Sequence, residues 1–183
     1  IRHLIRRHRQ IESNCTVLTG NSSHPQGYGR ILRNSSNAII GITEHLDIGR
    51  KGRDITEINS GMYCFSAKPL FKVLALLKRH NKQREYYLTD TVGLLINRGY
   101  NLSSFTVKDV EEIIGINSQR DLAFANRIMR QRIIEYHMKR GVTVVDPLTT
   151  YIDIRAKIGR DTVIEPLTVI EGEVRIGKGC VIG

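Results

Sequence analysis

The chain has 183 residues, of which 40% are hydrophobic, and a formal net charge of +10. Its longest uninterrupted apolar run, residues 73–77, is far too short to span a bilayer, so no membrane partner is expected. The basic residues are spread over several segments and form no single stripe with interleaved aromatic side chains, which argues against a nucleic-acid partner.

The three cysteines, Cys15, Cys64 and Cys180, show no CxxC spacing. An odd number of separated cysteines is typical neither of a disulfide framework nor of a zinc site. Their apolar surroundings indicate small buried side chains. We therefore expect a protein of the reducing cytoplasm.

Residues 1 to about 116 alternate between helix-like and strand-like patterns. Strands are expected at residues 16–19, 30–33, 38–42 and 60–65, with a loop over residues 21–29 and a hairpin turn at residues 34–37. Two helices are expected from their apolar faces, Leu70, Phe71, Leu74 and Leu77 in one, and Val92, Leu95 and Ile96 in the other. This alternation predicts an α/β domain with a covered, largely parallel sheet.

Residues 118–140 predict one long helix. Ser118 is a good N-cap with Asp121 three residues later, and Gly141 is typical of a C-terminal stop. An apolar stripe of Leu122, Ala125, Met129, Ile133 and either Tyr136 or His137 is expected to face inward. Because it stands between two different patterns, we interpret this helix as a connector.

Isoleucine recurs every six residues near the end of the chain, at Ile152, Ile158, Ile164, Ile170, Ile176 and Ile182. This period fits neither a helix nor an ordinary strand, but it suits a chain that turns after each short strand and stacks one aliphatic side chain per hexad. Gly159, Gly177 and Gly183 each follow one of these residues, where a corner needs a small residue. The pattern favours a parallel β-helix over the alternative, an amphipathic antiparallel sheet.

Three short segments carry possible chemistry. The glycine-rich turn at residues 27–30 allows close approach of a backbone N–H to a ligand, although such turns are common. Residues 43–47 and 57–61 place Glu and Asn beside presumed strand ends, where they can bind hydroxyls and amides or merely cap loops. The acidic pair in residues 111–117 can hold Mg²⁺ or simply be solvated.

These segments, with one more, resemble a bacterial enzyme family in their order and approximate spacing. The matching motifs are Gly27-Tyr28-Gly29-Arg30-Ile31, Glu44-His45-Leu46-Asp47, Glu57-Ile58-Asn59-Ser60-Gly61, Glu85-Tyr86-Tyr87-Leu88-Thr89-Asp90 and Gly115-Ile116-Asn117. The family is that of the bifunctional N-acetylglucosamine-1-phosphate uridylyltransferases and glucosamine-1-phosphate N-acetyltransferases. The stretch from Gly141 through the hexads resembles the junction of this family into a left-handed β-helix.

The resemblance implies a domain organisation. Residues 1–117 would be the C-terminal part of a Rossmann-like nucleotidyltransferase domain, residues 118–140 the connector, and residues 141–183 the first coils of the acetyltransferase β-helix. It also implies Mg²⁺-dependent transfer from UTP to N-acetylglucosamine 1-phosphate, and a homotrimer in the parent protein. The acetyl-CoA site of the fused domain would lie outside this chain.

Residue roles follow from the same resemblance. Gly29, Glu44 and Asn59 would hold the N-acetylglucosamine part of UDP-N-acetylglucosamine, and Asn117 would contact the same ligand and bind Mg²⁺. Leu46 stands where the family commonly has Lys, and Arg84 stands where Gly is usual, so the charge and loop shape near the sugar phosphate differ.

The family's nucleotide loop and metal-binding Asp would lie upstream of residue 1. We therefore expect a middle fragment that is inactive alone, with no catalytic residue of its own. Two alternatives remain open, a non-catalytic trimeric scaffold and a nucleotidyltransferase for another hexose 1-phosphate.

Overall fold

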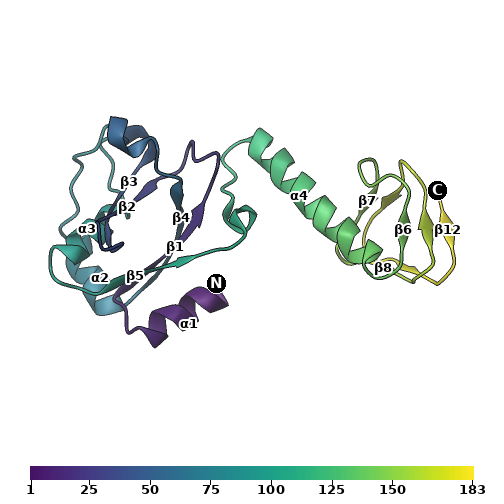
Figure 1. The fold of residues 1–183 in the computed structure, drawn as a ribbon, viewed down its shortest axis with the longest axis horizontal. Coiled ribbons are helices and arrows are strands. Elements are labelled where there is room, and N and C mark those ends of the chain that lie inside the picture. The colour runs from purple at the N-terminus through teal and green to yellow at the C-terminus, as the bar shows by residue number, and fades with distance from the viewer. The chain divides into compact units, whose positions relative to one another are not determined.

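The computed structural model describes the backbone of residues 1–183 and the side chains of all of them except residue 51. The chain forms two compact units, Ile1–Ile114 and Gly115–Gly183 (Figure 1). The division falls just before residue 117, where the sequence places the end of the first domain. Of the described helices, none is both long and apolar enough to cross a bilayer.

The first unit is built on a five-stranded sheet with the strand order β3-β2-β4-β1-β5. The strands are β1 (Cys15–Asn21), β2 (Arg30–Arg33), β3 (Ile39–Thr43), β4 (Glu57–Phe65) and β5 (Leu102–Thr106). The hairpin of β2 and β3 forms where the sequence predicts it, and the Asn34 side chain closes its turn by accepting from the Ser36 and Ala38 backbone N–H groups.

The prediction of a largely parallel sheet is wrong. Only β1 and β5 pair in parallel, whereas β4 pairs antiparallel with β1 and β2, and β2 pairs antiparallel with β3. Helices cover both faces of this sheet, so its strands place apolar side chains on both sides. That pattern reports burial on two sides and carries no information about strand direction.

The two faces of the sheet have separate cores. Helix α1 (Arg2–Gln10) covers one face, where Leu4 packs with Leu18, Ile58 and Ile113. Helices α2 (Ala67–Leu74) and α3 (Asp90–Ile96) cover the other face. The core of this second face consists of Cys15, Val17, Ile31, Ile39, Val73, Val92 and Leu95.

The buried face of helix α2 differs from the face predicted from the sequence. Val73 is fully buried, whereas Phe71, which the sequence places inward, is 71% exposed. Both residues fit a helical period with Leu70, Leu74 and Leu77, so periodicity alone does not choose between them. Three 3₁₀ turns complete the unit, η1 (His45–Asp47), η2 (Arg50–Gly52) and η3 (Val110–Ile113).

The predicted connector is helix α4 (Gln119–Met138) in the second unit. Ser118 is its N-cap, because its hydroxyl oxygen accepts from the Asp121 backbone N–H at 3.2 Å and its O–H donates to the Asp121 carboxylate at 2.8 Å. Gly141 follows the helix with φ +86°, the left-handed conformation typical of a helix stop.

The apolar stripe predicted for α4 is only partly correct. The buried residues are Ile128, Ile134 and His137, whereas Leu122 and Met129 are about two-fifths exposed at 39% and 43%. Ile134 joins the core of the repeat region that follows, so the C-terminal part of the helix is positioned by that contact.

Short parallel strands stacked as coils make up the rest of the second unit. They are β6 (Thr143–Val144), β7 (Tyr151–Ile152), β8 (Lys157–Ile158), β9 (Val163–Ile164), β10 (Val169–Ile170), β11 (Arg175–Ile176) and β12 (Val181–Ile182). β7, β8 and β9 each pair in parallel with the strand three hexads later, β10, β11 and β12 respectively, as a β-helix with three hexads per coil requires. Ile152, Ile164 and Ile170 are buried, which confirms the inward position of the repeated isoleucine.

Coil stacking leaves no room for a side chain at Gly159. A Cβ atom there would stand 2.5 Å from the carbonyl oxygen of Gly177 on the next coil, and backbone atoms cannot move aside. At Gly177, which occupies the same place in its own hexad, a Cβ would meet the Cys180 sulfur at an ordinary 3.7 Å.

We predict that Gly159→Ala destabilises the second unit by about 1–3 kcal/mol, because it overpacks the coil contact. Gly177→Ala is the matched control and should leave the free energy of unfolding nearly unchanged. Chemical denaturation of the 183-residue chain measures both. Equal effects of the two substitutions would contradict the stacking.

Candidate functional site

Gly29 lies at the point where the glycine-rich loop joins β2. The loop is a tight turn in which the Tyr28 N–H donates to the Pro25 carbonyl at 3.3 Å. A Cβ atom on Gly29 would stand 3.3 Å from the Glu44 carboxylate oxygen Oε2 and 3.4 Å from the Thr43 carbonyl oxygen. The missing side chain therefore lets the loop lie directly against the end of β3.

Glu44 follows β3 and is half-buried. Its oxygen Oε1 accepts a hydrogen bond from the buried Thr89 hydroxyl at 2.8 Å, while Oε2 lies against Gly29. Thr89 belongs to a motif noted in the sequence, but no role could be assigned to it there, because it lies 45 residues from its partner. This bond fixes the direction of the carboxylate.

Asn59 is the third residue of β4 and is 7% exposed. Its backbone N–H donates to the Gly29 carbonyl at 2.9 Å, and its side-chain oxygen Oδ1 accepts from the Gly61 N–H at 3.1 Å. Gly61 has φ +76° beside an irregularity in the β1–β4 pairing, so the strand bends back toward the Asn59 side chain. With Oδ1 occupied, the amide of Asn59 is oriented as a donor.

The structure thus brings Gly29, Glu44 and Asn59 together. Gly29 contacts both of the others, one through a backbone hydrogen bond and one through van der Waals approach. Gly29 supplies backbone, Glu44 a carboxylate and Asn59 a side-chain amide. Groups of these kinds bind the hydroxyls and amides of a neutral polar ligand.

The surroundings of Glu44 are acidic. Burial, together with the charges of Glu44 and Asp47, raises the pKa of the Asp90 carboxyl. The Lys82 ammonium donates to the Leu46 carbonyl, and the Lys82 N–H donates to Asp47 at 3.3 Å. The Lys82 ammonium therefore places a positive charge beside this acidic group.

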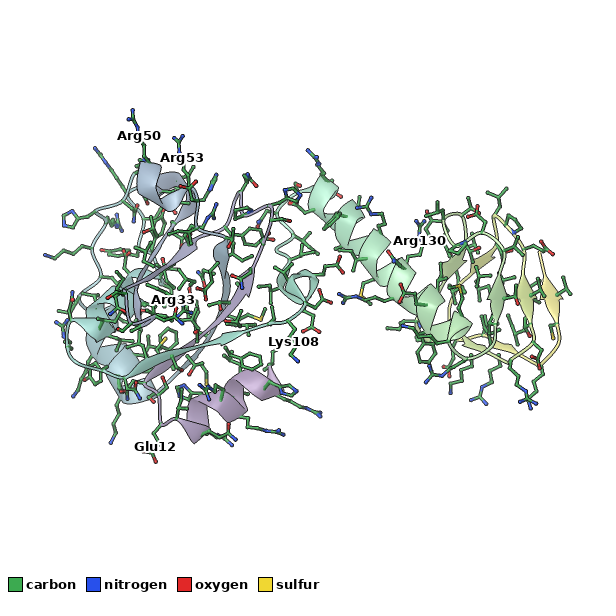
Figure 2. The ribbon with its side chains drawn as sticks, viewed as in Figure 1. Glu12, Arg33, Arg50, Arg53, Lys108 and Arg130 are labelled. Carbon is green, nitrogen blue, oxygen red and sulfur yellow. The ribbon has the colours of Figure 1, made fainter. Side chains whose placement is uncertain are left out.

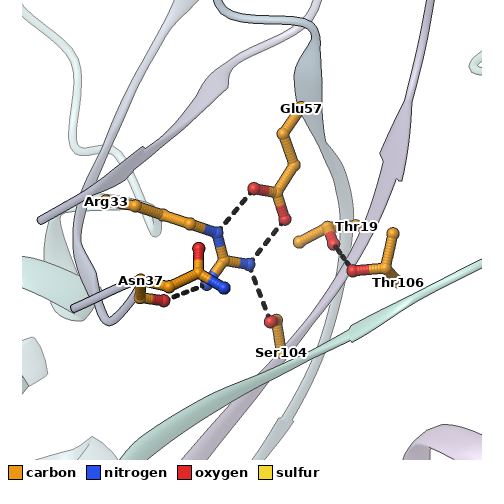
Figure 3. A network of polar contacts seen from close by, with 6 residues as sticks. All are labelled: Thr19, Arg33, Asn37, Glu57, Ser104 and Thr106. Carbon is orange, nitrogen blue, oxygen red and sulfur yellow. Dashed lines mark hydrogen bonds and ion pairs between the residues drawn. The ribbon is translucent and has the colours of Figure 1, made fainter. Parts of the chain in front are cut away.

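An ion pair crosses the same face of the sheet (Figure 3). The Arg33 guanidinium donates two hydrogen bonds of 2.6 Å to the Glu57 carboxylate and a third, of 2.8 Å, to the Ser104 hydroxyl. The pair ties β2 to β4 and reaches β5, beside the Thr19–Thr106 hydroxyl pair. The sequence offered no signal for this contact, since its partners are far apart along the chain.

The position of Arg33 sets it apart from other arginines. Arg50 and Arg53 extend outward from the turn η2, whereas Arg33 lies over the sheet with its side chain 21% exposed (Figure 2). Burial alone would raise the pKa of Glu57, but hydrogen bonds from Arg33 and Thr19 and the charge of Arg33 outweigh it, so the pKa lies below its usual value. The hydrogen bond to Glu57 raises the pKa of Arg33.

Asn117, the fourth predicted site residue, belongs to the second unit and is exposed just before α4. Its N–H donates to the Asp121 carboxylate at 3.1 Å, and that carboxylate also accepts from Ser118. Within the part of the chain that the structure describes, no three His, Cys, Asp or Glu residues are grouped to hold a metal ion. Asn117 fits as a single oxygen ligand of Mg²⁺, the rest of whose coordination would come from phosphate, water or other residues.

Comparisons with known proteins bear on the fold and the family of the chain. Residues 155–183 match the family described as bacterial transferase hexapeptide (six repeats). A crystal structure from Bacillus anthracis, described as a glucose-1-phosphate thymidylyltransferase, shares the fold with a TM-score of 0.52 at 21% identity. It covers 70% of this chain, and the chain covers 48% of it. The chain thus shares its fold with that structure and carries a segment that matches the hexapeptide-repeat family.

Relatives that contain both parts are named bifunctional protein GlmU. The chain is 46% identical to that of Acetivibrio thermocellus over 96% of its length, 47% identical to that of Geobacillus thermodenitrificans over 98%, and 42% identical to that of Clostridioides difficile over 100%. It spans 38–40% of the length of these relatives. The chain is therefore a homologue of part of the GlmU proteins, which confirms the recognition made from its motifs.

We predict that Glu57→Gln lowers the free energy of unfolding at pH 7 by about 2 kcal/mol, the scale of hydrogen bonds to a charged group. Because the folded pKa of Glu57 is depressed, its contribution is present above the pKa of the unfolded state and is lost as pH falls through the folded value. The difference between wild type and variant should therefore shrink below about pH 4.

Urea unfolding at a series of pH values measures this. Glu112→Gln, at an exposed position of η3, is the control and should have no effect. A Glu57→Gln effect that stays constant down to pH 2 would contradict an ionised pair.

Proposed function

We propose that this chain is the sugar-binding and connector part of an enzyme that transfers a uridylyl group from UTP to N-acetylglucosamine 1-phosphate. In the whole protein this activity is fused to an acetyl-CoA-dependent glucosamine-1-phosphate acetyltransferase. The observation that carries the proposal is the convergence of Gly29, Glu44 and Asn59 in a chain 41–47% identical to GlmU proteins.

Each residue of the cluster has a separate task in the proposal. The Glu44 carboxylate, held by Thr89, accepts hydrogen bonds from sugar hydroxyls. The Asn59 amide, whose oxygen is occupied by Gly61, donates to an oxygen of the sugar. Because Gly29 has no side chain, the sugar ring can approach the backbone at this point.

The reaction needs no protein nucleophile, since the sugar phosphate itself attacks the α-phosphate of UTP and pyrophosphate leaves. The contribution of this chain is positioning, which holds the phosphate-bearing sugar in line for attack. Mg²⁺, when bound, neutralises charge on the phosphates, and Asn117 is proposed as one of its ligands.

Two alternatives differ in testable ways. A nucleotidyltransferase for another hexose 1-phosphate would bind glucose 1-phosphate as well as the N-acetyl sugar. A non-catalytic scaffold would bind neither. The donor orientation of Asn59 favours the N-acetyl sugar, because a carbonyl oxygen is an obligate acceptor.

Assembly and location belong to the same proposal. The outer rows of the β-helix expose large apolar side chains, among them Tyr151 at 52% and Val169 at 58%. Exposed apolar rows of this kind support assembly of the parent protein, which we propose to be a homotrimer. The three free thiols support a cytoplasmic location.

We predict that the 183-residue chain binds N-acetylglucosamine 1-phosphate more tightly than glucose 1-phosphate, and that Glu44→Ala weakens this binding by about 1–3 kcal/mol. The substitution leaves both a sugar hydroxyl and the Thr89 hydroxyl without an acceptor. NMR titration of the labelled chain measures the affinities, with Glu112→Ala as the control. Equal affinity for both sugars would favour the second hexose specificity, and no binding would favour the scaffold.

We further predict that the chain alone releases no pyrophosphate from UTP when N-acetylglucosamine 1-phosphate is supplied. Asn117 provides one Mg²⁺ ligand, and one ligand does not orient a triphosphate. A coupled pyrophosphate assay with the GlmU protein of a relative as positive control tests this. Sugar-dependent release by the chain itself would overturn the proposed assignment of parts.

A further inference from the structure

Arg30 carries a buried guanidinium that the proposed site does not use. It is the first residue of β2, directly follows Gly29, and is only 3% exposed. It pairs with Thr43 of β3 and with Ile58 of β4, each of which immediately precedes a residue of the proposed sugar site. The backbone of Arg30 therefore lies at the centre of that site.

The side chain of Arg30 leaves the sheet on the face that α1 covers. Its cross-strand neighbour Ile58 packs with Leu18 in the core of that face, and neighbours in register share a face. Asn59 follows Ile58 and so points to the other face. Both β2 and β4 begin here, so a ligand at this end of the sheet can contact side chains of both faces.

The hydrogen bonds of the Arg30 guanidinium leave one edge of it unpaired. Among the described residues its one acceptor is the Tyr28 carbonyl, which is bonded by Nη1. Nε is enclosed by protein and has no acceptor there, and Nη2 has none either but is not enclosed as Nε is. Burial lowers the pKa of Arg30, and no ion pair with a described carboxylate offsets this. The unpaired edge, Nε and Nη2, thus has one nitrogen that can be reached from outside.

Arg33, on the same strand, shows what this edge of a guanidinium binds. Its Nε and Nη2 each donate a hydrogen bond of 2.6 Å to the Glu57 carboxylate (Figure 3). Two parallel N–H groups match two oxygens of one oxyanion, whether carboxylate or phosphate. Arg30 has the same edge without an oxyanion among the described residues, and a buried charge left unpaired destabilises a protein. An oxyanion that arrives with a ligand would remove that cost.

We propose that Arg30 binds a phosphate group of a ligand through the hydrogens of its Nε and Nη2. The inference deepens the proposed function and rests on it for the source of the phosphate, because UTP and N-acetylglucosamine 1-phosphate both carry such groups. Arginine suits this task, since its planar fork stays charged even when it is buried.

The NMR signals of the arginine Nε–H groups test the proposal in the 183-residue chain. N-acetylglucosamine 1-phosphate or pyrophosphate should shift the Arg30 signal downfield, because this hydrogen gains an acceptor. The Arg33 signal is the internal control and should stay, because Glu57 already binds that group. N-acetylglucosamine, which has no phosphate, should move neither signal. A response to the sugar phosphate assigns its phosphate to Arg30, and a response to pyrophosphate alone assigns a nucleotide phosphate.

Substitutions should make stability and affinity move in opposite directions. Arg30→Met removes the charge and keeps an apolar stem, so without ligand the variant should unfold at the same temperature as wild type or higher. The Kd of the phosphate compound that shifts the Arg30 signal should rise about tenfold. Arg30→Lys keeps the charge but loses the fork, and its Kd should rise by a smaller factor. Arg53→Met, at an exposed position, is the matched control and should leave the Kd unchanged.

Two results overturn the inference. One is an Arg30 signal that no phosphate compound moves, or that moves no further than the signal of Arg33. The other is an Arg30→Met variant that binds the phosphate compound as wild type does. Failure of the proposed sugar site is a separate result. In that case N-acetylglucosamine 1-phosphate leaves the Gly29 and Asn59 signals unmoved, while pyrophosphate still shifts the Arg30 signal.

Discussion

The register of β4 is the constraint on which the proposed site depends. This strand lies between β2 and β1 and is bonded to both, so its position determines which side chains meet at the loop end of the sheet. The bond from the Asn59 N–H to the Gly29 carbonyl joins the two site residues directly. A slip of one residue would turn Asn59 to the opposite face and bring Ile58 out of its core. The Arg33–Glu57 pair resists that slip on the same face.

Where a pattern is local or strictly periodic, it could be read from the sequence. The six-residue period predicted parallel stacked strands, because only a chain that turns after each strand keeps one isoleucine per hexad inward. The β2–β3 hairpin and the Ser118 cap depend on neighbouring residues and formed as predicted. Gly29, Glu44 and Asn59 were proposed from family resemblance, and in the fold Gly29 lies beside each of the other two.

Other features depend on contacts between distant residues and have no local signal. Strand direction is decided by how β4 inserts between β1 and β2, and apolar composition does not record it. The partnership of Thr89 with Glu44 spans 45 residues. The face of α4 that packs inward is chosen by the repeat region through Ile134, since several helical phases have similar apolar content.

The central claim is that Gly29, Glu44 and Asn59 form one sugar-binding pocket. The most direct measurement is a set of isotope-filtered nuclear Overhauser effects between N-acetylglucosamine 1-phosphate and the labelled chain. We expect contacts from the sugar ring and its acetyl methyl group to the Gly29 N–H and to the side chains of Glu44 and Asn59. Contacts confined to other residues, with none to these three, would contradict the claim.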